Sequence, residues 1–312
     1  MSLLRSTARG AAGRAARRRR GVASAAARDA AWGYFFVAPS LLAFLAFSLY
    51  PMLRSILLSF QHFTLRSTEW VGLENYQALL ANPTFYVVLR NTLVYALLIV
   101  PLGVVLSITL AGLIFRLPGP AQVFFKSAYY LPVVTSGVVL SLIWLFLYDP
   151  AWGLLNYLLG LVGLGPVQWL SDPRTSLPSL VLMYHASHWG GSIILLTASM
   201  GGIPEHLYEA ARLDGASQLR QALAITVPLL RPALAYVAIT GMIASLQVFT
   251  EIFLMTNGGP NFATTNLVYF IYERGFIMFD FSMASAVATI LLVITATIAV
   301  VQFRFFATDV EY

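Results

Sequence analysis

Cysteine is absent from this chain of 312 residues. Its absence excludes disulfides, iron–sulfur clusters and thiol nucleophiles. The sequence also lacks a Gly-x-x-x-x-Gly-Lys-Ser/Thr phosphate loop and a Gly-x-Ser-x-Gly nucleophile elbow. We therefore expect the chain itself to have no catalytic residue, to hold no cofactor or metal, and to have no ATP site of the usual kind.

Charged residues are also scarce, at 10% of the chain, whereas 59% of its residues are apolar. Soluble domains carry roughly 25% charged residues. The apolar residues form long continuous runs, which favour membrane-spanning helices over the short alternating strands of a barrel. A helix crosses a hydrocarbon layer of about 30 Å with roughly 20 residues. The sequence therefore predicts an all-α membrane protein with a six-transmembrane-helix bundle.

The predicted spans divide the chain into a tail, one bundle domain and a short end. Residues 1–31 are predicted to be a disordered basic tail, because Arg, Ala, Gly and Ser offer too little apolar surface to fold. Residues 32–306 form the predicted bundle, and residues 307–312 form a second short tail. Pro51 is expected to bend or end the first span, and Pro132 lies inside the third. The six spans are predicted at residues 32–50, 85–114, 127–147, 179–200, 229–253 and 281–303.

Positive charge sets the predicted orientation. Eight of the 19 Lys and Arg residues lie in the basic tail, and with six spans 14 of the 19 lie on its side of the membrane. Because Lys and Arg accumulate in cytoplasmic segments, we expect both termini in the cytoplasm. Residues 149–178 then form an external loop, predicted to contain one short interfacial helix. A signal peptide or a nucleic-acid partner would also suit a basic N-terminus, but an anchor near anionic lipid is favoured and no nucleic acid is expected.

A polar segment, residues 201–228, separates the fourth and fifth spans. Pro204 suits the first turn of a helix, where its missing N–H has no partner in any case. Asp214 and Gly215 can leave right-handed helical space, and Ser217 can cap a second helix. The sequence therefore predicts a helix, a sharp turn and a second helix.

Ala210 and Ala211 present almost no side chain, so this face of the first helix suits docking into another protein's groove. With Glu209 before them and the turn after them, they resemble the EAA loop of membrane permease subunits in binding-protein-dependent ABC importers. The resemblance implies a cytoplasmic coupling helix that enters a groove of an ATPase subunit. The residues that it assigns to coupling are Glu205, Tyr208, Glu209, Ala210, Ala211, Asp214, Gly215 and Ala216.

Three further segments extend the resemblance. Residues 70–76 resemble the family's first external loop, and residues 90–92 resemble the opening of its second span. Residues 255–260, Met-Thr-Asn-Gly-Gly-Pro, resemble a turn of the first permease in the carbohydrate branch, the maltose and glycerol-phosphate type. The resemblance implies a type I importer fold in the plasma membrane of a bacterium or archaeon. The partners that it implies are a second homologous permease, two ATPase subunits that use ATP and Mg, an external solute-binding protein, a carbohydrate-type substrate and the lipid bilayer.

Polar residues within the predicted spans form a second candidate site, because polar groups are costly against lipid and tend to face an interior or an aqueous path. Two of the spans carry such residues at helical spacing, and the stripe in the fifth span ends at a carboxylate expected at the external mouth. An aromatic ring beside hydroxyl, amide and imidazole groups can stack on a sugar ring and hydrogen-bond its hydroxyls. The substrate-path candidates are His185, His188, Trp189 and Ser192 in the fourth span, and Thr240, Gln247 and Glu251 in the fifth.

The same side chains allow other interpretations. They can simply hydrogen-bond between neighbouring helices. His185 and His188 can also be the ligand pair of a membrane metal enzyme, although that span holds no acidic or thiol partner. The main alternative function is a stand-alone transporter driven by an ion gradient. Such a transporter needs carboxylates at mid-membrane, and the predicted spans have almost none away from their ends.

Overall fold

The computed structural model describes residues 30, 32–64 and 66–306. The predictions for the two tails therefore concern, apart from Ala30, residues outside this description. The chain divides into two compact units, residues 1–57 and 58–312.

The described part of the first unit is one apolar helix, which runs from Trp32 to Leu58. The first span does not end at Pro51, because the helix continues through α2 (Tyr50–Leu58). A π-helical turn, η1 (Leu45–Leu49), directly precedes it. Pro51 has no N–H to donate, and the wider π turn lets the helix pass it without the usual clash. Neither η1 nor α2 has a buried residue.

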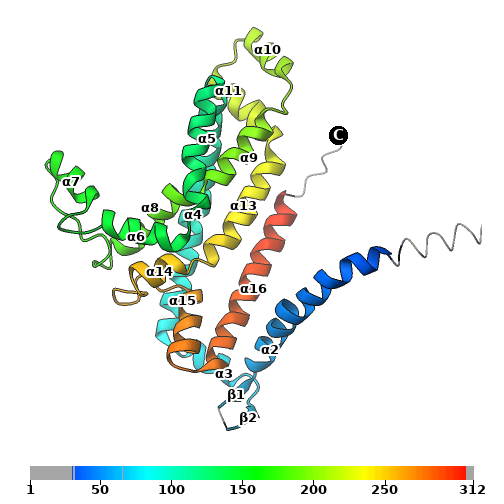
Figure 1. The fold of residues 1–312 in the computed structure, drawn as a ribbon, viewed down its shortest axis with the longest axis vertical. Helices are drawn as coiled ribbons and strands as arrows, with labels where there is room; N and C mark the ends of the chain where they lie inside the picture. Colours follow the sequence, from blue (N-terminus) through cyan, green and yellow to red (C-terminus); the bar gives the residue numbers. More distant parts are fainter. Residues whose placement is uncertain (1–29, 31, 65, 307–312) are drawn as a thin grey trace, which may run out of the picture. The chain divides into compact units, whose positions relative to one another are not determined.

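The second unit is a helical bundle with one small hairpin (Figure 1). In chain order its elements are β1 (Gln61–Phe63), β2 (Thr68–Trp70), α3 (Glu74–Leu80), α4 (Pro83–Phe115), α5 (Gly119–Val134), α6 (Gly137–Leu147), α7 (Leu154–Leu161), α8 (Ser176–His188), α9 (Gly190–Met200), α10 (Glu205–Leu213), α11 (Gln218–Gln221), η2 (Ala222–Thr226), α12 (Val227–Leu229), α13 (Arg231–Leu246), α14 (Thr250–Met255), α15 (Leu267–Tyr272), η3 (Glu273–Ile277) and α16 (Phe281–Phe306).

Four helices of the described chain are long and apolar enough to cross a membrane. They are the first helix, α4, α13 continued by α14, and α16. The span predicted at residues 127–147 is not one continuous helix, because α5 and α6 meet at an angle of 103°. Thr135 and Ser136 adopt extended backbone there, with ψ of 141° and 134°. Pro132 weakens the preceding turn, since it cannot donate the hydrogen bond that a continuous helix needs.

The predicted fourth span, residues 179–200, is also interrupted. Helix α8 ends at His188, and α9 starts at Gly190 after a break at Trp189. A Cβ on Gly190 would lie 2.0 Å from the carbonyl oxygen of Tyr129 in α5, so only glycine permits this approach of two backbones. The short helix predicted within residues 149–178 is confirmed as α7, whereas α15 and η3 were not predicted.

The core lies where the long helices contact one another. Helix α4 packs against α9 and α13, and α13 packs in turn against α16. The larger buried cluster joins side chains of α4, α8, α9, α13 and α14, and a smaller one joins α3, α4, α15 and α16. In Figure 1, α10 projects from one end of this unit, while α3 and the β1–β2 hairpin lie at the other end. The antiparallel hairpin pairs Gln61 with Trp70.

Candidate functional site

The polar segment between α9 and α13 forms the predicted helix, turn and second helix. Helix α10 starts directly after Pro204, whose missing N–H costs nothing at that position. Gly215 has a φ of +77°, a left-handed conformation that suits glycine at a helix end. Ser217 then caps α11 by accepting a hydrogen bond from the N–H of Arg220 at 3.3 Å.

Helix α10 is held by few contacts. None of its residues is buried. The Tyr208 hydroxyl lies 2.9 Å from the Thr226 hydroxyl in η2, and the Gln221 amide donates to the Ala216 carbonyl at 2.8 Å. Beyond the loop, the side chains of Arg116 and Gln218 are hydrogen-bonded. These contacts fix the turn but leave the outer surface of α10 open.

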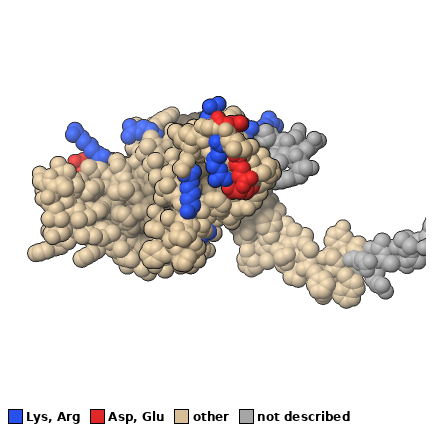
Figure 2. Space-filling view, turned by 90° about the horizontal axis from the view of Figure 1, so that it is seen from above, with Lys and Arg blue, Asp and Glu red and all other residues tan. Residues whose placement is uncertain are grey.

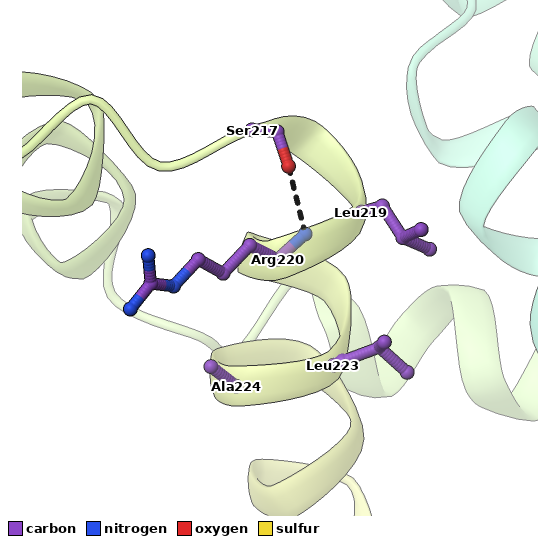
Figure 3. Close-up of a pocket in the computed structure, with 5 residues that line it drawn as sticks. All are labelled: Ser217, Leu219, Arg220, Leu223 and Ala224. Carbon is purple, nitrogen blue, oxygen red and sulfur yellow. Dashed lines mark hydrogen bonds between the residues drawn. The ribbon is translucent and has the colours of Figure 1, made fainter.

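The open surface includes both the predicted coupling residues and apolar side chains that the prediction omitted. Glu209 and Ala210 are exposed, and Glu209 makes no hydrogen bond or ion pair with the described residues. Leu213 at the end of α10 is 90% exposed, and Leu219 and Leu223 are exposed as well. Figure 3 shows Leu219 and Leu223 projecting from the same side of a shallow groove. Their spacing of four residues is the signal that could have identified them.

Charged side chains surround this apolar surface. Seen from the α10 end, Lys and Arg side chains lie beside a smaller acidic group (Figure 2). Arg212 and Glu205 form an ion pair at 2.7 Å, with both side chains more than half exposed. Exposed pairs of this kind contribute only about 0–1 kcal/mol. These charges therefore contribute to the electrostatic potential around α10 more than to the stability of its fold.

The α9 and α13 helices form a hairpin with α10 at its tip. This hairpin is bounded by two helix breaks, one at Trp189 and one at residues 247–249. A contact between side chains at the two breaks connects α8 with α14. His188, the last residue of α8, lies 3.3 Å from the carboxylate of Glu251 in α14. The two arms of the hairpin therefore end next to each other at these breaks.

Glu251, which the sequence places at the external mouth, is a buried residue paired with α8. Only 10% of its side chain is exposed, against 29% for His188. The Tyr184 ring stacks on the imidazole with centroids 4.2 Å apart, and its carbonyl oxygen lies 3.3 Å from Nδ1 of His188. A second buried phenol, Tyr95, has no hydrogen-bond partner among the described residues. Neither tyrosine was singled out from the sequence.

Trp189 is not a free stacking platform, which corrects a second expectation. The residue is 6% exposed, and its ring fills a cradle between Gly103 of α4 and Gly241 of α13. A Cβ on Gly103 would lie 1.8 Å from the ring, and one on Gly241 would lie 3.1 Å away. The neighbouring His185 directs Nε2 to the carbonyl oxygen of Leu98 at 3.2 Å. The two histidines of α8 therefore have different partners, since His185 approaches α4 and His188 approaches α14.

Thr240 and Gln247, together with the intervening Ala244, are exposed along one side of α13 and its end. Thr240 also donates a hydrogen bond to the Tyr236 carbonyl at 2.7 Å. Glu251 does not continue this exposed stripe, because it is buried and lies beyond the break at residues 247–249. Ser192 is half-buried on α9. Among the described residues, no three His, Asp or Glu side chains gather closely enough to hold a metal ion.

Comparisons with known proteins identify the class of this bundle. The chain is 35% identical to the probable ABC transporter permease protein YurN of Bacillus subtilis strain 168, over 89% of this chain and 97% of that protein. The chain belongs to the ABC transporter permease family. The permease is also 31% identical to the arabinooligosaccharides transport system permease protein AraP of the same strain, over 87% of each chain. No family model matches the sequence.

The fold of the permease matches a solved structure. It superposes with a TM-score of 0.78 and 24% identity on a chain of the bacterial alginate ABC transporter in complex with an alginate pentasaccharide-bound periplasmic protein, over 89% of this chain and 96% of that one. The permease is thus a multi-pass membrane subunit of an ABC transporter and is not itself an enzyme. ATP hydrolysis lies in separate subunits, and the ion-gradient alternative has no support.

Proposed function

We propose that this permease forms half of the path of an ATP-driven importer for a carbohydrate or a related solute. The proposal rests on the similarity to a permease named for arabinooligosaccharides and on the likeness to the alginate transporter. A second permease would complete the path, two ATPase subunits would use ATP and Mg, and an external solute-binding protein would deliver the substrate.

The proposed topology has six spans. They comprise the first helix, α4, α5, α8 with α9, α13 with α14, and α16. In Figure 1, α10, the turn between α4 and α5, and the end of α16 lie at the same end of the second unit. The elements at this end contain Arg116 at the end of α4, Arg212 in α10, Arg220 in α11, Arg231 at the start of α13 and Arg304 in the last turn of α16. Because Lys and Arg favour the cytoplasm, we place this end and both termini inside.

The exposed tip of the α9–α13 hairpin is the observation that carries the coupling proposal. Residues with small, acidic or apolar side chains lie there without partners in the described chain, although the turn that presents them is well ordered by hydrogen bonds. A groove in an ATPase subunit would cover them, with Leu213 as the largest apolar contact. In this proposal, ATP binding closes the ATPase pair, moves α10, and tips the bundle from an inward-open to an outward-open state.

The proposed substrate path follows the exposed side of α13. Thr240 and Gln247 offer a hydroxyl and an amide there, and Ser192 offers a second hydroxyl on α9. Such groups can hydrogen-bond sugar hydroxyls without carrying a net charge. Trp189 and Glu251 are enclosed by the chain itself, so we assign them no direct contact with substrate.

Substitution of Glu209 tests the coupling role. In the assembled transporter, we expect Glu209→Ala to abolish ATP-dependent uptake of arabinooligosaccharides and the ATPase activity stimulated by the solute-binding protein, with membrane insertion unchanged. His206→Ala is the matched control, because His206 is exposed on the same helix outside the predicted coupling residues. Normal stimulated ATPase activity in the Glu209 variant would refute the proposal.

A further inference from the structure

We propose that His188 and Glu251 are a positioning pair that clamps the two helix breaks together, so that α9 and α13 tilt as one hairpin when α10 moves. This inference rests on the proposed coupling function and assigns the pair to the transport step rather than to substrate binding. It concerns the end of the hairpin that lies furthest from α10.

The position of the pair in the chain supports this role. His188 is the last residue before the first break, and Glu251 lies in the first turn after the second break. The pair therefore joins α8 to α14, the two elements from which the hairpin extends. Without this link, each break would be free to bend separately, and a displacement of α10 would not move the two arms together.

The chemistry of the pair supports a lasting contact. Both ring nitrogens of His188 face acceptors, the Glu251 carboxylate at 3.3 Å and the Tyr184 carbonyl oxygen at 3.3 Å. Stacking of the Tyr184 ring on the imidazole fixes the plane of the His188 ring. Glu251 is buried and has no other side-chain partner among the described residues. Removing His188 would therefore leave a buried carboxylate unpaired, which is more damaging than losing both charges.

Trp189 supplies the pivot next to the clamp. Its ring contacts α4 through Gly103 and α13 through Gly241, so it touches both the fixed part of the core and one arm of the hairpin. The first break is thus packed against α4 on one side and against α13 on the other. With the clamp intact, the hairpin can tilt about the indole without separating from α4.

The absence of cysteine allows a direct test in the assembled transporter. Nitroxide labels on Ala186→Cys and Ala244→Cys, two exposed positions on either side of the breaks, report the distance between the end of α8 and the end of α13. With the pair intact, we expect one narrow distance distribution without nucleotide and one after addition of Mg-ATP and vanadate. His188→Ala should broaden both, and should lower ATPase stimulation by the solute-binding protein about tenfold.

Two further variants make the result specific. His185→Ala is the matched control, because this histidine lies one turn earlier and contacts only the Leu98 carbonyl among hydrogen-bond acceptors. It should keep the narrow distributions and the stimulation. The exchanged pair His188→Glu with Glu251→His should narrow the distributions again relative to His188→Ala, which a general packing defect would not predict.

The outcomes separate the two proposals. If His188→Ala matches His185→Ala in both measurements while Glu209→Ala abolishes stimulation, the clamp is refuted and the coupling function stands. If Glu209→Ala retains stimulation, the coupling function fails. A raised KM for substrate in His188→Ala with unchanged distance distributions would instead assign His188 to substrate binding and overturn the clamp.

Discussion

The two ends of the second unit satisfy their polar groups in opposite ways. At the end that holds α15, Asn91 in α4 donates to the carbonyl oxygens of Phe262 and Thr265 at 2.7 and 3.1 Å. Thr92 accepts a hydrogen bond from the N–H of Leu267, and Asn266 caps α15 through the N–H of Tyr269. Thr264, Thr265 and Asn266 are at most 1% exposed.

The α10 end has no comparable interior. No residue of α10, α11 or η2 is buried, and large apolar side chains face outward. At the α15 end, the polar groups are therefore hydrogen-bonded within the chain itself. At the α10 end, an ordered surface remains exposed. The proposed coupling surface therefore lies apart from the region that stabilises the fold, and substitutions can test this separation.

The largest loss of stability is expected in the core between these ends. Gly103→Ala should lower the free energy of unfolding by about 3 kcal/mol, because its Cβ would overlap the Trp189 ring. Gly112→Ala in the same helix is the control, since its Cβ would meet only the Met200 side chain at 3.9 Å. Thermal unfolding in detergent measures both, and equal stability of the two variants would contradict the tight cradle.

A smaller loss is expected at the α15 end. Asn91→Ala should cost about 2 kcal/mol, because two buried carbonyl oxygens lose their donor. Gln77→Ala, which removes an exposed amide from α3, should leave the unfolding temperature unchanged. Equal unfolding temperatures for the two variants would show that the hydrogen bonds of Asn91 do not stabilise the α15 end.

The smallest effect on stability is expected at α10. Leu213→Asp should change the free energy of unfolding by no more than about 0.5 kcal/mol, because the side chain is 90% exposed. The same change should abolish stimulated ATPase activity in the assembled transporter, whereas Leu213→Met should retain it. Loss of stability together with activity would show that the two regions are not separable.

Sequence patterns predicted the helical membrane class and the helix, turn and helix around Asp214 and Gly215, because apolar runs and turn residues act locally. They did not predict the bend after α5 or the break at Trp189. Both depend on contacts with distant segments, such as the backbone of Gly190 against Tyr129. The same limit applies to the candidate site. Helical spacing suggested that His185 and His188 act together, yet their partners lie 87 residues before one and 63 residues after the other.

The Trp189 indole fits tightly between Gly103 and Gly241. This fit restricts which residues can replace these three during evolution. A larger residue at position 103 or 241 requires a smaller one at position 189, so these three positions are expected to vary together or not at all. A change of volume at the pivot would also alter how far the hairpin can swing. In the proposed mechanism, permeases with different stroke lengths would arise from exchanges at three buried positions, with the exposed surface of α10 left unchanged.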